Sequence, residues 1–344
     1  MPDSENIDLR FLEAHEAEVL VDLIRETYGD SYDADWVYLP NEIAARINDN
    51  RLRSAVGYLA DGTILGHMAL MMEETAERVL HAGLAVVRDE ARGHHLFERM
   101  KQFSAEWATK AGYLGLFSEA TAAHPYSQKA NIALGAHETG FLLGWIPDSV
   151  ANNAARTLDK HRQSVALFYL KLNEGPLRPM YVPRKYQGIV GNIVSTSGLH
   201  SFLAVADPNT VIPESTDFEI EQKDDHNLSV IHVTRVGRDL IKVVNNERER
   251  QLTEVNRDAV YVDLPLQSHA TQLVLDPLTD QTKFGFAGVF PNRERNGDVL
   301  RLQSFADIDL HVEDISIASD HGRELLDFIV SDWRAVSVVS RGAF

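Results

Sequence analysis

The chain has 344 residues, which at roughly 150 residues per domain predicts about two domains. Lys and Arg total 33 against 51 Asp and Glu, so the formal net charge is −18, which argues against a protein that coats nucleic acid or an anionic membrane. The absence of cysteine excludes disulfides, thiolate metal sites and a cysteine nucleophile. Without an apolar run of transmembrane length, a signal-peptide pattern or a lipidation motif, we expect a cytoplasmic protein.

Short strands alternate with helices in the first half. Leu96, Met100, Phe103 and Trp107 share one face of a long helix that Gly112 closes. An Asp-Gly pair predicts a two-residue turn in a hairpin. The predicted elements, in chain order, are strand 7–12, helix 15–28, a helix that opens at Pro40, hairpin strands 54–60 and 63–71, strand 79–87, the long helix, strand 113–119 and a helical segment after Pro125.

Two blocks of this half carry a family resemblance. Val86-Val87 ends a strand and leads to Arg92-Gly93-His94-His95-Leu96-Phe97 at the start of the long helix, and the second block is HPYSQKANIALGAHETGFLLGWIP at 124–147. This layout resembles the GNAT (GCN5-related N-acetyltransferase) superfamily. The resemblance implies an acyl-CoA, normally acetyl-CoA, as co-substrate. The strand would bond the pantetheine arm, and the loop amides and helix N-terminus would hold the pyrophosphate.

The chain departs from the family pattern at three positions. The usual loop reads Arg/Gln-x-x-Gly-x-Gly/Ala, so Arg92 fits, whereas His95 and Phe97 occupy the small-residue positions. In one alignment of the second block, Asn131 falls where many members carry the tyrosine that protonates the leaving thiolate. In another alignment of the same block, Ala136 falls there. Tyr126, the nearest tyrosine, is the predicted substitute.

Carboxylates are the candidate bases. Glu119 ends the strand that, by the resemblance, splays from its neighbour to admit the acyl chain, and it would deprotonate the amine directly or through water. The alternative is a strand-end carboxylate that caps an amide. Glu73 and Glu74 would either contact a cationic substrate or stay solvated. The histidines of this half are adjacent (94 and 95) or single, and show no ligand spacing, so no metal site is predicted.

The second half repeats part of the first. LGLFSE at 114–119 and AVYVDL at 259–264 each precede a helix-length segment, a Gly-Phe pair, a further glycine and a proline. Residues 181–199 are predicted to form the first helix of this copy, and strands are expected at 164–172 and 298–305. Gly237 is only a weak remnant of the anion loop, and 246–250 (NERER) indicates a solvated helix face.

The sequence thus predicts an α/β (α+β) protein of two tandem GNAT-like domains, each a mixed, mostly antiparallel central sheet flanked by helices. The first, 1–173, would bind acyl-CoA, and the second, 177–344, would be degenerate. The leading hypothesis is an N-acetyltransferase in which a small-molecule or peptide amine attacks the thioester directly. The alternatives are a ligand-sensing or scaffold protein and an aminoacyl-tRNA-dependent transferase, for which no basic patch is visible. The resemblance also implies a homodimer.

Overall fold

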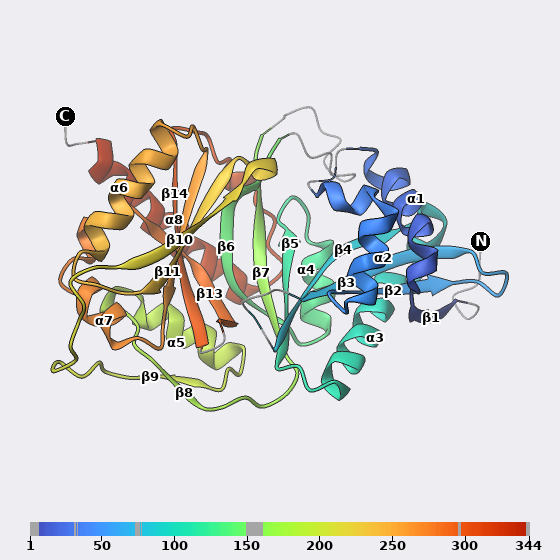
Figure 1. Cartoon of the computed structure of the whole chain (residues 1–344), viewed down its shortest axis with the longest axis horizontal. Coiled ribbons are helices and arrows are strands. Elements are labelled where there is room, and N and C mark those ends of the chain that lie inside the picture. The colour runs from blue at the N-terminus through green and yellow to red at the C-terminus, as the bar shows by residue number, and fades with distance from the viewer. Residues whose placement is uncertain are drawn as a thin grey trace.

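One large sheet runs through the part of the chain that the computed structural model describes, residues 7–30, 32, 34–72, 76, 78–148, 161–294 and 297–341 (Figure 1). Its strand order is β1-β2-β3-β4-β5-β7-β6-β13-β14-β12-β11-β10, and every described pairing is antiparallel except β4–β5 and β11–β12. The strands are β1 (Asp8–Phe11), β2 (Leu52–Tyr58), β3 (Ile64–Met72), β4 (Val79–Val87), β5 (Gly115–Thr121), β6 (His137–Ile146), β7 (Gln163–Lys171), β10 (Asp217–Lys223), β11 (Leu228–Arg235), β12 (Ala259–Pro265), β13 (Gly285–Glu294) and β14 (Gly297–Phe305). A two-stranded sheet joins β8 (Arg178–Met180) to β9 (Ser201–Leu203).

Helices cover both faces of this sheet (Figure 1). They are α1 (Ala17–Tyr28), α2 (Pro40–Asn48), α3 (Leu96–Lys110), α4 (Tyr126–Ala133), α5 (Gln187–Thr196), α6 (Leu240–Thr253), α7 (His269–Leu275) and α8 (Asp320–Arg341). The predicted class, a mixed and mostly antiparallel sheet flanked by helices, is confirmed. Within the described residues, no helix combines the length and apolarity needed to cross a membrane.

The first half buries two cores because its strands alternate their side chains. Val56 of β2 packs with Leu20 and Ile24 of α1, on one face of the sheet. Its neighbour Ala55 packs with Met100 of α3, on the other. The helix that carries the candidate anion loop therefore lies opposite α1 and α2.

The internal repeat is present in three dimensions. β5 and β12 have the same length, each pairs in parallel with the strand before it, and one constant shift in numbering aligns both ends of the two strands. The same shift aligns Leu96 with Leu240, the first residues of α3 and α6.

The hairpin turn differs from its prediction. Leu59 and Thr63 form the last hydrogen bond between the two strands, so three residues and not two make the turn. Gly62 has a φ of 89°. The added residue is accommodated because glycine adopts this left-handed conformation readily.

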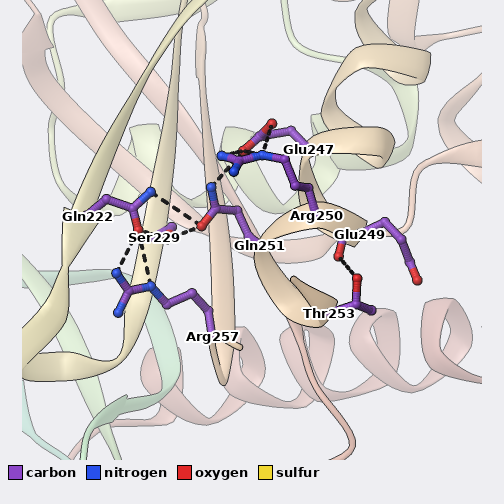
Figure 2. Close-up of polar contacts among 8 residues, drawn as sticks. All are labelled: Gln222, Ser229, Glu247, Glu249, Arg250, Gln251, Thr253 and Arg257. Atoms are coloured by element: carbon purple, nitrogen blue, oxygen red, sulfur yellow. Dashed lines mark hydrogen bonds and ion pairs between the residues drawn. The ribbon is translucent and has the colours of Figure 1, made fainter. Parts of the chain in front are cut away.

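The charged stretch 246–250 is only partly solvated, which corrects the prediction for it. Glu247 accepts a hydrogen bond from the buried Gln251, 2.7 Å away, and Gln251 contacts Ser229 of β11 (Figure 2). Arg248 donates to Ser304 Oγ of β14 at 2.6 Å, and burial lowers its pKa. Two of the five residues, Glu247 and Arg248, are thus partly buried toward the sheet, and the other three are exposed.

The two halves join edge to edge between β6 and β13. The described pairing there is a single one, Gly140 with Gly288. A Cβ on Gly140 would lie 2.6 Å from the Gly288 Cα, so both positions need glycine for the backbones to approach. Helix α8 contacts both strands at this junction.

Candidate functional site

The strands β4 and β5 separate part-way along their length. Their ladder has three pairs, Val79–Gly115, Leu80–Leu116 and His81–Phe117, and gives the later residues of β4 no partner on β5. A register shift on the β3 side and a φ of 48° at Leu84 mark a bulge just beyond His81. Bulges bend and twist a strand, so the bulge turns Val86 and Val87 away from β5.

The loop after β4 leads to the N-terminus of α3. Gly93 and His95 both have positive φ, 82° and 54°. His95 is the residue before the helix, and no side chain caps the first turn. Because the first N–H groups of a helix have no acceptor within it, Leu96 and Phe97 present backbone donors here. The Leu96 side chain is buried against the sheet.

Charges around the loop are of both signs. Arg92 is 54% exposed and pairs with the exposed Asp89 at 2.9 Å. His95 contacts Glu98 one turn later. A hollow of about 440 Å³ lies beside the loop, and its charged lining residues are three carboxylates (Glu26, Asp89 and Glu90) and two guanidinium groups (Arg88 and Arg92). Exchanging the exposed carboxylate partner of Arg92 for a phosphate costs little, since exposed ion pairs contribute little. Arg92 is therefore available to an anionic ligand, although carboxylates outnumber arginines around the hollow.

The two predicted catalytic residues have different surroundings. Glu119 lies two residues before the end of β5 and is half-buried. Burial raises the pKa of Tyr261, whereas the charge of Asp263 raises the pKa of Arg301 against the effect of burial, and the charge of Glu119 adds to both increases. Glu119 thus interacts electrostatically with residues of the second half of the chain. Tyr126, the first residue of α4, is 72% exposed and packs against the His124 ring. Glu73 and Glu74 lie outside the described residues.

A buried polar group that the sequence analysis missed lies between α3, β5 and α4. Lys101 Nζ is 3.3 Å from Ser118 Oγ, contacts Asn131 Oδ1 and lies 5.6 Å from the centre of the Phe97 ring. Asn131, the predicted cofactor-binding residue, donates in turn to the Ser127 carbonyl at 3.0 Å. Burial lowers the pKa of Lys101 to about 7.

The corresponding helix N-terminus of the second copy is covered. Gly237 N–H donates to Thr216 Oγ1 at 3.0 Å, and Arg238 N–H donates to the Pro213 carbonyl at 2.8 Å. A Cβ on Gly237 would lie 2.2 Å from the Ser215 carbonyl carbon, so the segment 213–216 lies directly on this turn. By the constant shift these two donors align with Gly93 and His94 of the loop before α3, and in the second copy the protein itself uses them.

In the second copy, the two parallel strands β11 and β12 stay paired further along their length than β4 and β5 do. The β11–β12 ladder has five pairs and ends at His232–Asp263. The constant shift aligns Asp263 with Glu119. Asp263 forms two hydrogen bonds to Arg301, at 2.6 and 2.7 Å, and His232 lies 3.1 Å away. Hydrogen bonds to Asp263 and Glu221 raise the pKa of His232 to about 9 against the effect of burial.

Among the described residues, one group is compact enough to hold a metal ion. His161, His311 and Asp314 offer ligand atoms that all lie within 4.8 Å of one another. His161 Nε2 lies 3.8 Å from Asp314 Oδ2. Sequence spacing did not indicate this group because its members come from segments far apart in the chain.

No family model matches the chain, and no curated protein matches it. Solved structures do. A spermidine/spermine N-acetyltransferase from Vibrio cholerae is 15% identical with a TM-score of 0.39, covering 49% of this chain and 94% of that one. A phosphinothricin acetyltransferase of the GNAT superfamily from Sinorhizobium meliloti is 19% identical with a TM-score of 0.41, covering 49% and 90%. A ribosomal-protein-S5-alanine acetyltransferase from Vibrio fischeri is 12% identical with a TM-score of 0.40, covering 49% and 94%. These are the class of protein that the sequence blocks resemble.

Proposed function

We propose that this protein is an acyl-CoA-dependent N-acyltransferase, with acetyl-CoA as the expected donor. The observation that carries the proposal is the separation of β4 from β5 beside an uncapped helix N-terminus that bears Arg92. The first feature leaves strand-edge backbone groups open for an extended ligand arm, and the second is suited to a pyrophosphate. The second copy has neither feature, because its loop before α6 is bonded internally and its strands β11 and β12 stay paired.

The predicted residues other than Tyr126 and Asn131 have a role in this scheme. Arg92 and the amides from Gly93 to Phe97, His94 and His95 included, hold the pyrophosphate, and the free edge at Val86 and Val87 bonds the arm. Glu119, or a water that it orients, takes a proton from the amine, which attacks the thioester directly, without a covalent enzyme intermediate. Tyr126 is too exposed to exclude water, so the proton for the leaving sulfur must come from elsewhere.

The same reasoning assigns the two halves. We propose that residues 1–173 form the acyl-CoA-binding domain and 177–344 a degenerate copy that supports it. In the second copy the equivalents of the anion loop and of Glu119 are both occupied by internal contacts.

Thiol release from acetyl-CoA tests the activity. Candidate acceptors are spermidine, kanamycin and Nα-acetyl-lysine, because an acidic protein is compatible with cationic amines. We expect release that depends on one of these amines and falls about 10²–10⁴-fold in Glu119→Gln. Release that is independent of every amine, or unchanged in Glu119→Gln, would contradict the assigned reaction or base.

A non-catalytic ligand sensor is the second candidate. The observation in its favour is that Lys101 of α3, which lies beside the Phe97 ring, contacts Asn131 of α4 and so connects the two helices. His95, in contrast, does not obstruct the loop, since its side chain is 78% exposed. Acyl-CoA binding without turnover of any amine would favour the sensor.

A further inference from the structure

Lys101 lies in a place where a lysine is costly. Its side chain is 3% exposed, and within the described part of the chain no carboxylate pairs with it. Its polar partners are neutral oxygens, Ser118 Oγ and Asn131 Oδ1, and the third neighbour is the Phe97 ring. Removing an ammonium from water without a counter-charge is unfavourable, so packing alone would select an apolar side chain here.

The fold does not require this lysine. The constant shift between the copies aligns Lys101 with Asn245 and Ser118 with Val262. Asn245 bonds backbone groups of the 281–283 segment, and Val262 is an apolar core residue. The second copy therefore builds the same helix and strand without a buried amine.

The Nζ amine of Lys101 lies beside the point where β4 and β5 separate. Phe117 is the last β5 residue that pairs with β4, and Ser118, which contacts Lys101, is the next residue. A ligand arm that follows the free edge of β4 would reach this point from the α3 loop. Phe97 lies one helical turn before Lys101, on the loop side of the amine.

We propose that Lys101, as an ammonium ion, stabilises the sulfur of the departing coenzyme as a thiolate, an inference that rests on the proposed function. When the acceptor nitrogen bonds to the carbonyl carbon, the C–S bond breaks and its electron pair moves to sulfur. The Nζ ammonium pairs with that thiolate, which takes up a proton from solvent when coenzyme A leaves. Asn131 and Ser118 position Nζ, and the thiolate supplies the counter-charge that no described carboxylate gives this buried amine. The acceptor's own proton leaves through Glu119 or water.

Coenzyme A with its free thiol provides the test, since a nearby ammonium ion favours the thiolate, which absorbs in the ultraviolet where the thiol does not. At pH 7 an ordinary thiol of pKa about 8.5 is only about 3% ionised. We expect the bound thiol to be more than half ionised in the wild-type protein, as a difference spectrum against desulfo-coenzyme A. In Lys101→Met the thiolate band should disappear while coenzyme A still binds. Lys110→Met, on the exposed end of the same helix, should behave as wild type.

Each outcome is decisive. A thiolate band of equal size in Lys101→Met overturns the role of Lys101 and leaves the proposed function intact. If Lys101→Met does not fold, Lys101→Gln replaces it, and the band must again be lost. The absence of coenzyme A binding to the wild-type protein overturns the proposed function and this inference together.

Discussion

His95 is the residue at which the candidate loop departs most from backbone preference. Its φ of 54° lies in the left-handed region, and the resembled loop carries glycine at this position. A side chain in this conformation stores about 1–2 kcal/mol of strain per residue. The sequence could not predict the strain because φ depends on how the loop meets the helix.

Replacing His95 by glycine should relieve this strain. We expect His95→Gly to raise the free energy of unfolding by about 0.5–1 kcal/mol, after the entropy cost of an added glycine is subtracted. His94→Gly is the matched control, since His94 does not have positive φ, and it should lose about the same amount. Equal changes in both variants, measured by urea unfolding, would contradict the strain assignment.

At the residue scale, the sequence pointed to Arg92 and Asn131 as cofactor-binding residues, which stay predictions, and it gave no role to the buried Lys101 that contacts Asn131. The face of α3 that the apolar spacing selected was that of Leu96, Met100, Phe103 and Trp107. A second buried face follows Lys101 and consists of small residues: Ser104, Ala105 and Ala108. Small residues at helical spacing indicate close packing, and this pattern was the available sign that Lys101 is buried.

At the scale of elements, the repeat was predictable, whereas its charged interior was not. The strands β5 and β12 follow from local hydrophobic patterns, which is why their ranges were nearly right. Asp263 and Arg301 stand on β12 and β14 opposite each other, both buried. Nothing in a single sequence shows which two distant charged residues will pair.

The buried pair makes a stability prediction. Arg301→Met removes two hydrogen bonds to Asp263 and leaves it His232 as its partner among the described residues, so we expect a cost near the lower end of about 3–5 kcal/mol, because His232 compensates the buried charge only in part. The double variant Asp263→Leu with Arg301→Met should recover most of that loss, since an apolar replacement of both partners is often neutral. Chemical unfolding measures both. A double variant as unstable as the single one would show that the pair itself stabilises the strands.

The whole molecule differs from two independent domains. Each half was expected to have its own sheet, and the fold instead continues one sheet from β6 to β13. Helix α8, from the end of the chain, bonds to both strands. Ser319, just before α8, donates to Glu138 of β6 at 2.6 Å, and Asp332 accepts the Phe286 N–H of β13 at 2.7 Å. Edge pairing of distant strands has no local sequence pattern, which is why it was not predicted.

The junction should be sensitive to a single methyl group. In Gly288→Ala the added Cβ would lie 2.7 Å from the Gly140 Cα, so we expect a loss of about 1–3 kcal/mol from overpacking. Gly188→Ala on α5 is the control, because nothing lies within 4 Å of its Cβ and alanine favours a helix. Thermal unfolding should separate the two variants. An unchanged Gly288→Ala protein would mean that the two halves are not joined as described.

The most direct test of the account is an isothermal titration with acetyl-CoA. Arg238 is the matched control for Arg92, because it is 59% exposed, pairs with a carboxylate and precedes the covered helix of the second copy. We predict micromolar binding to the wild-type protein, loss of binding in Arg92→Glu and unchanged binding in Arg238→Glu. No binding of acetyl-CoA to the wild-type protein, or equal binding to both variants, would contradict the assignment of the α3 loop as the acyl-CoA site.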